Sequence, residues 1–64
     1  MDAQLIYEAR TLATGATIHD INGMIGMYRA ACEDGIIENI RLFHAELSKL
    51  VTEARAARWK REHR

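Results

Sequence analysis

The sequence predicts an all-α protein, and three observations support that prediction. The 64-residue chain contains no proline, so no residue in it is excluded from a helix interior. Apolar residues recur every three or four positions along most of the chain, which is the spacing of one helix face. No stretch alternates apolar and polar residues as a half-buried strand does. We therefore expect a single helical domain over residues 1–64, with helices at about 2–14, 18–33 and 36–61.

The first predicted helix lies between a capping residue and a glycine. Asp2 has a side chain that commonly caps a helix N-terminus, and Gly15 is typical of the residue that follows a helix. Apolar residues between them share one face at helical spacing. They are Leu5, Ile6, Ala9, Leu12 and Ala13. The segment is therefore expected to be a short amphipathic helix that packs through one side.

The second predicted helix has a start signal and a stop signal of its own. Thr17 followed by Asp20 is similar to a capping box, with Asp in place of Glu. The dipeptide Asp34-Gly35 is a turn signal that ends the segment. The apolar face between them comprises Ile18, Ile21, Ile25, Tyr28 and Cys32. These residues recur at spacings of three and four, which predicts one apolar seam that continues to the turn signal.

Two glycines interrupt this second segment. Gly23 and Gly26 each cost about 1 kcal/mol relative to alanine inside a helix, and Asn22-Gly23 is itself a turn signal. The apolar spacing continues in phase across both glycines, so one continuous helix is expected. A break at Asn22-Gly23 is the alternative. A GxxG sequence also grips nucleic-acid backbone in KH domains, but that fold needs strands, which this sequence does not predict.

The third predicted helix carries the longest pattern in the chain. Its apolar residues repeat in alternating steps of four and three, the spacing of a coiled-coil seam. A tight turn at Asp34-Gly35 would place the second and third helices antiparallel, as a helical hairpin. The first helix would then lie beside the second half of the third, either collinear with the second or hinged at Gly15. The seam is Ile36, Ile40, Phe43, Leu47, Leu50 and Ala54. The main core residues are expected to be Ile18, Ile25, Tyr28, Ile40, Phe43, Leu47 and Leu50.

The chain is too short to bury a large core by itself. Below about 70–80 residues a single core rarely supplies more than about 3–5 kcal/mol. Cys32 is the single cysteine, which excludes an intrachain disulfide, and the three histidines do not have the spacing of a zinc site. The second helix is also apolar over most of its circumference. We therefore expect a homodimer or higher oligomer, assembled as a dimeric helical bundle. The expected self-association residues are Met24, Met27 and Leu42.

In size and topology such a hairpin resembles the Rop family of RNA-binding helical hairpins. It is similar to the same extent to the small helical chaperones of type III secretion. No shared motif accompanies either resemblance, so neither implies a function for this chain.

The formal net charge of zero conceals two regions of opposite sign. Residues 1–48 contain three basic and seven acidic side chains, a net charge of −4. Residues 49–64 contain six basic and two acidic side chains, a net charge of +4. Trp59 lies in the basic segment and off the predicted apolar seam. The candidate partner-binding residues are therefore Arg55, Arg58, Trp59, Lys60 and Arg61.

Three interpretations of this basic end are open. Cations complement the dipole at a helix C-terminus, which would give the segment a purely structural role. A tryptophan among arginines is typical of a protein interface. The same segment would also suit phosphate contacts by Arg58, Lys60, Arg61 and Arg64, while Trp59 stacks on a base. The acidic turn at Asp34 and the neutral total charge weigh against a dedicated nucleic-acid binder.

The residues form no catalytic, metal-binding or cofactor-binding constellation. A nucleophilic cysteine needs a histidine base and an orienting group, and Cys32 is interpreted instead as a small core side chain. The chain lacks the basic start and apolar run of a signal peptide, lacks a membrane-spanning segment, and has one cysteine, as a cytoplasmic protein would. We expect a non-enzymatic protein-interaction module, a regulator, adaptor or inhibitor of the kind found in phage and bacterial accessory genes. The alternative is a nucleic-acid-binding regulator that uses the basic helix end.

Overall fold

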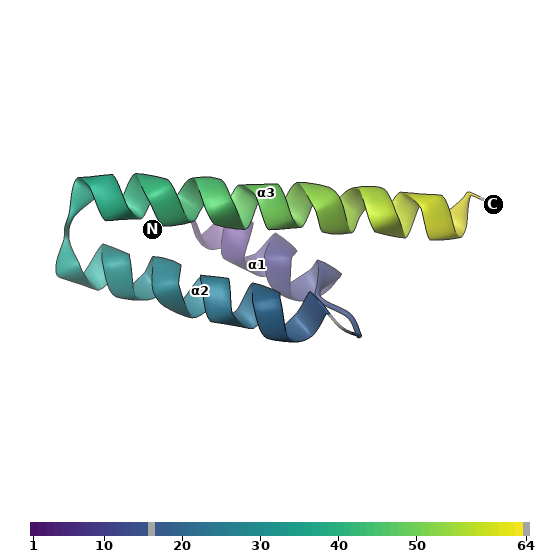
Figure 1. The fold of residues 1–64 in the computed structure, drawn as a ribbon, viewed down its shortest axis with the longest axis horizontal. Coiled ribbons are helices and arrows are strands. Elements are labelled where there is room, and N and C mark those ends of the chain that lie inside the picture. The colour runs from purple at the N-terminus through teal and green to yellow at the C-terminus, as the bar shows by residue number, and fades with distance from the viewer. Residues whose placement is uncertain (16, 64) are drawn as a thin grey trace.

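The computed structural model describes residues 1–15 and 17–63, which form three α-helices and no strand (Figure 1). The helices are α1 (Ala3–Leu12), α2 (Thr17–Asp34) and α3 (Ile37–Glu62). The predicted all-α class is confirmed. The predicted bounds differ slightly from the observed ones: α1 starts one residue later and ends two earlier, α2 extends one residue further at each end, and α3 is shifted by one.

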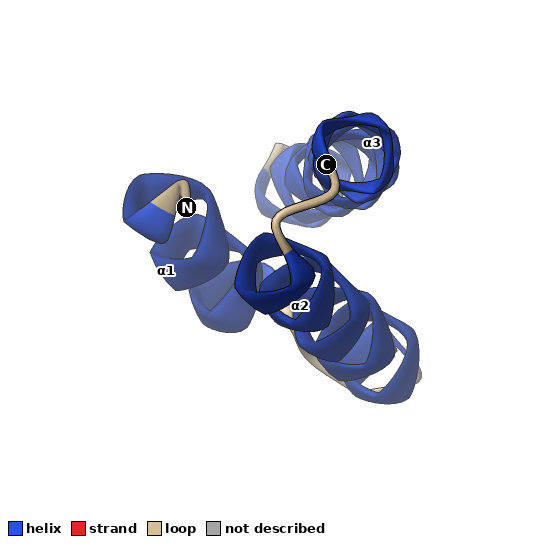
Figure 2. Cartoon of the chain, turned by 90° about the vertical axis from the view of Figure 1, so that its left-hand side faces the viewer, coloured by secondary structure: helices blue, strands red, loops and turns tan. Residues whose placement is uncertain are grey.

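The first helix is capped as expected and then folds back on the second. The Asp2 carboxylate accepts a hydrogen bond from the Leu5 backbone N–H at 3.0 Å, so the predicted N-cap is confirmed. Gly15 has a φ of +54°, a conformation that glycine adopts at little cost. The chain reverses there, and α1 lies beside α2 and α3 (Figure 2). The hinge at Gly15 is therefore the correct alternative, and the collinear arrangement is wrong.

The second helix is continuous through both glycines, so the predicted alternative of a break at Asn22-Gly23 is wrong. A methyl group added at Gly23 or Gly26 would meet no atom within 4 Å, so neither glycine is required for packing inside this chain. Burial of apolar residues on the opposite face, Ile21 and Ile25 among them, offsets the intrinsic cost of the two glycines.

The predicted capping box at the start of α2 does not form. Thr17 is the first helical residue rather than the cap. Its hydroxyl donates to the Thr14 carbonyl at 2.8 Å and accepts from the Thr14 N–H at 3.2 Å. Threonine commonly makes such local bonds to the backbone, and here they stabilise the turn before the helix.

The core lies where the three helices meet. Tyr28, Ile21, Leu47 and Val51 are its largest fully buried side chains. Ile25 is also buried, and Ile40, Phe43 and Leu50 are half-buried against this cluster. The prediction for Ile18 is wrong: this side chain is 43% exposed because it lies in the first turn of α2, on the flank of the buried face.

The third helix runs past the other two. In Figure 1, α2 and α3 lie side by side in opposite directions, and the C-terminal end of α3 projects beyond both neighbours. The Cα extents are 43 × 16 × 15 Å. The accessible surface is 4784 Å², against about 4,200 Å² for a compact monomer of this size. The chain therefore leaves more surface uncovered than a globular protein of its length. No helix in the described part of the chain combines the length and apolar character needed to cross a membrane.

Candidate interaction surface

A polar cluster joins the start of α1 to both other helices. The Asp2 backbone N–H donates to the Tyr28 hydroxyl at 2.7 Å, and the Asp2 carboxylate lies 3.0 Å from Nε2 of His44. The rings of Tyr28 and His44 meet edge to face, with centroids 5.7 Å apart. The hydrogen bond from His44, with a smaller contribution from the Leu5 N–H, lowers the pKa of the Asp2 carboxyl below its ordinary value. The cluster is thus a structural joint in which the carboxylate is already engaged.

The far end of α1 is tied to α3 by an ion pair. The Glu8 carboxylate lies 2.6 Å from the Arg55 guanidinium. Asp2 is near His44 and Glu8 is near Arg55, so α1 runs in the same direction as α3. Arg55 was expected to bind a partner, and the structure gives it an acidic neighbour within the chain. Sequence reasoning missed both ties; Asp2 was recognised as a cap, but its distant partners leave no local pattern.

The C-terminal end of α3 extends beyond the ends of α1 and α2 (Figure 1). We call residues 55–63 the projecting end, and every residue in it is exposed. Apart from the Arg55–Glu8 ion pair, its contacts follow helical spacing: Arg58 bonds Glu62 at 3.1 Å, and Trp59 stacks on His63 with ring centroids 4.4 Å apart. The His63 ring also bonds the Trp59 carbonyl at 2.9 Å. These contacts hold the helix end in shape while leaving it open to solvent.

Trp59 borders an apolar hollow on the outer side of α3. Its side chain is 60% exposed, and the adjacent hollow is shallow, wide open to solvent and formed by α3 alone. The lining residues are Thr52, Arg55, Ala56, Trp59 and Lys60. Carbon atoms form most of this lining, including the aliphatic stems of the two cations. The hollow is therefore suited to an apolar side chain of another molecule.

The three residues expected to mediate self-association have different surroundings. Met24 is half-buried and packs against the chain's own core. Met27 on α2 and Leu42 on α3 are each more than half exposed. Leu42 shares its helix with Trp59 and lies near the opposite end of it.

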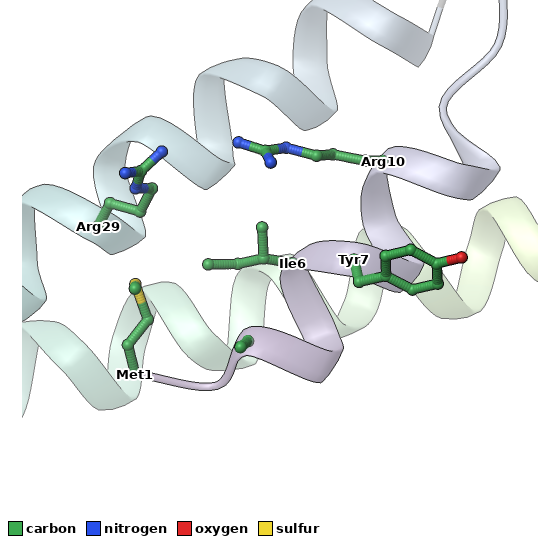
Figure 3. A pocket seen from close by; sticks show the side chains of 6 residues that line it. Met1, Ile6, Tyr7, Arg10 and Arg29 are labelled. Atoms are coloured by element: carbon green, nitrogen blue, oxygen red, sulfur yellow. The ribbon is translucent and has the colours of Figure 1, made fainter.

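A second hollow lies between α1 and α2 (Figure 3). It has a volume of about 280 Å³ and includes Met1, Ile6 and Tyr7 in its lining. The side chains of Arg10 and Arg29 extend over Ile6 from the two helices (Figure 3). This volume is below the roughly 300–1,000 Å³ of typical small-molecule pockets, and both arginines are exposed. We therefore give more weight to the hollow beside Trp59.

One of the predicted phosphate contacts, Arg58, is paired with a carboxylate, as is the nearby Arg55. Arg55 pairs with Glu8 and Arg58 pairs with Glu62. Lys60 and Arg61 are the cations of the projecting end with no ion pair to a described residue, and Arg64 lies outside the described residues. No group of three potential metal ligands occurs among residues 1–15 and 17–63, and Cys32 is a half-buried free thiol.

Comparison with protein-family models, with curated proteins and with solved structures gives no match to this chain. Function is therefore argued from the residues and their geometry.

Proposed function

We propose that this chain is a non-enzymatic protein-interaction module that binds another polypeptide through the outer side of α3. In this role it would act as a small cytoplasmic regulator, adaptor or inhibitor. The observation that carries the proposal is the position of Trp59. This large aromatic side chain stands 60% exposed on a helix end that projects from the rest of the protein. Tryptophan flanked by arginine is the composition most enriched at the energetic centres of protein interfaces.

The energetics of Trp59 favour a covered state. An aromatic side chain of this size buries about 150–250 Å² when it is fully covered. Removing the exposed part, on the order of 100 Å², from water would stabilise a complex by about 2–3 kcal/mol. The stacked ring of His63 covers only one side of the indole. A partner that fills the adjacent hollow would cover much of the remainder.

The proposal includes assembly as a homo-oligomer, with α2 and α3 acting as an antiparallel helical hairpin. The extended shape and the excess of accessible surface support this part. A core made by 64 residues provides little stability, so burial of further surface between copies would add to it.

Nucleic-acid binding is the less favoured function. It relies on free cations to neutralise phosphates, and one of the predicted phosphate contacts, Arg58, already bonds a carboxylate within the chain. Catalysis is likewise not proposed, because the Asp2–His44 pair serves to cap and anchor α1.

A capture experiment tests the proposal. The tagged chain is immobilised and exposed to a lysate of the source cell together with untagged copies of itself, and the bound proteins are identified by mass spectrometry. We expect specific capture by the wild type, and its loss in Trp59→Ala with unchanged helicity. Tyr7→Ala is the matched control, because Tyr7 is an exposed aromatic residue on α1. Equal capture by Trp59→Ala, or no capture at all, would contradict the proposal.

A further inference from the structure

We infer that the polypeptide bound by α3 is a second copy of this chain, paired antiparallel so that Leu42 of each copy meets Trp59 of the other. This inference rests on the proposed function, because it names the partner of the same surface. It is carried by the pattern of exposed residues along the outer side of α3.

The outer side of α3 carries a second seam of residues in coiled-coil spacing. Its first six members each lie two positions after a residue of the inner, core-facing seam, and are therefore about 200° further round the helix. Its last two members continue the same spacing beyond the end of the inner seam. The steps alternate between four and three, as paired helices require. Every member is exposed. The outer seam comprises Glu38, Leu42, Ala45, Lys49, Thr52, Ala56, Trp59 and His63.

The outer seam is complementary to itself when reversed. Its midpoint lies between Lys49 and Thr52, and residues equally distant from that midpoint would face each other in an antiparallel pair. A contact with two-fold symmetry uses the same patch on both copies, so each opposed pair occurs twice. The opposed pairs are Leu42 with Trp59, Ala45 with Ala56, Lys49 with Thr52, and Glu38 with His63.

The sizes of the opposed residues fit this arrangement. The large pair of Leu42 and the partner's Trp59 lies towards each end, and the small pair of Ala45 and the partner's Ala56 lies closer to the middle, where the backbones can approach. Leu42 would enter the apolar hollow beside the partner's Trp59, which has space for an aliphatic side chain. Arg41 is exposed and would lie level with the partner's Lys60, one position away from that indole and within reach to stack on it.

The charges select the antiparallel orientation. In this register Glu53 lies beside the partner's Lys49 on the flank of the contact, and Glu38 faces the partner's His63. In a parallel pair with the same register, each residue would face its own copy, which places Lys49 against the partner's Lys49 and Glu38 against the partner's Glu38. Like charges directly opposed disfavour that orientation.

The rest of the chain leaves room for the second copy. The view along the helices shows α1 and α2 to one side of α3, with the far side of α3 uncovered (Figure 2). The contact would extend over most of α3, which is 26 residues long or about 39 Å. A single helix pair contributes fewer residues than the 20–30 a side of a standard interface. We therefore expect a concentration-dependent dimer rather than a permanent one.

Disulfide trapping tests the register. In a Cys32→Ser background, Ala45→Cys and Ala56→Cys chains are purified separately and then oxidised, each alone and mixed. The register places these two positions opposite each other, whereas identical positions are roughly 16 Å apart along the helix axis. We expect the mixed disulfide to form at least tenfold faster than either symmetric one. Thr11→Cys, exposed on α1, measures random collision. Faster Ala45→Cys self-linking, or no rate above the Thr11→Cys control, would overturn the inference.

Measuring the oligomeric state of variants tests whether Trp59 and Leu42 form the contact. Sedimentation equilibrium over a concentration series should show a monomer–dimer equilibrium for the wild type. Trp59→Ala and Leu42→Ser should each weaken it at least tenfold, and circular dichroism should show unchanged helicity. Tyr7→Ala, at an exposed aromatic residue on α1, is the control and should leave the equilibrium unchanged. Met27→Ser tests the alternative that the exposed apolar side of α2 mediates self-association. Dissociation by Met27→Ser alone would overturn the inference. A monomeric wild type that still captures a different protein through Trp59 would also overturn it, while leaving the proposed function intact.

Discussion

The middle of α3 and its projecting end belong to one continuous helix but have opposite surroundings. In the middle, Leu47 and Val51 are 0% and 2% exposed beneath α1 and α2. From Arg55 to His63 every residue is exposed, including the chain's single tryptophan. Burial of apolar side chains stabilises the middle of α3. The projecting end is helical because it continues a helix that is already formed. The helix end therefore keeps a large aromatic residue in contact with solvent.

Local interactions are sufficient to continue the helix into solvent. Extending a formed helix avoids the unfavourable nucleation step, and Ala56 and Ala57 have the best intrinsic helix propensity. The Arg58–Glu62 pair has the i,i+4 spacing that contributes about 0.2–0.5 kcal/mol. The contrast between the two regions can therefore be tested by substitutions that distinguish burial from local contacts.

The largest expected effect comes from truncating a leucine in the middle of α3. Leu47→Ala should lower the free energy of unfolding by about 2–5 kcal/mol, because it leaves a cavity at a fully buried site. That loss is comparable to the whole stability of a domain this small, so the variant should be largely unfolded. Leu42→Ala, measured at concentrations where the chain is monomeric, should change stability by less than about 0.5 kcal/mol. Thermal melts followed by circular dichroism compare the two, and equal losses would contradict the contrast.

An intermediate effect is expected from the polar joint under α1. Tyr28→Phe removes the hydroxyl that accepts the Asp2 N–H while keeping the buried ring. The loss should be about 0.5–1.5 kcal/mol, measured as a shift of the urea midpoint. Tyr7→Phe removes an exposed hydroxyl and should have no measurable effect. If both variants behave alike, the joint does not contribute to stability.

A smaller effect, of the opposite sign, is expected on the solvent side of α2. Gly23→Ala should raise the free energy of unfolding by about 0.5–1 kcal/mol, because alanine has the better helix propensity and its methyl group meets no other atom. Gly35→Ala is the contrasting variant: Gly35 has a φ of +73°, so alanine should destabilise the turn there. Chemical denaturation of both variants would show whether Gly23→Ala raises the free energy of unfolding while Gly35→Ala lowers it.

The smallest expected effect is a change of folding stability with pH in the acidic range. The pKa of the Asp2 carboxyl is lowered in the folded protein by the His44 and Leu5 hydrogen bonds. The Asp2 carboxylate therefore makes its full contribution to folding stability above its pKa in the unfolded chain, near pH 4. That contribution is lost as the pH falls through its pKa in the folded protein. Asp2→Asn should show a flatter stability profile between pH 2 and pH 5. Asp20→Asn controls for the loss of one negative charge on an exposed residue; an equally flat profile in that variant would exclude the joint as the cause.

The helices were predicted well because the signals for them are local in the sequence. The Asp2 cap, the glycine at position 15 and the three-four spacing of apolar residues each depend on neighbours within one or two turns. Val51 was missed because two helices pack on α3, which makes the buried face wider than a seam of two positions per heptad. Ile18 was wrongly included because spacing alone does not show where a helix is covered.

The site was predicted in part. The residues of the projecting end could be selected because charge and a lone tryptophan are visible in the sequence. The Glu8–Arg55 pair and the Asp2–Tyr28–His44 cluster could not, because both depend on the direction in which α1 folds back at Gly15. That direction is not visible in the periodicity of the sequence.

The joint at Asp2 also constrains the order in which the protein can fold. Its two partners follow Asp2 by 26 and 42 positions, so α1 is synthesised well before the residues that anchor it. Closing loops of that length costs more chain entropy than closing the short turn between α2 and α3. We therefore expect α2 and α3 to associate first and α1 to dock last. Native-state hydrogen exchange should then find the amides of α1 opening at a lower free energy than those around Leu47.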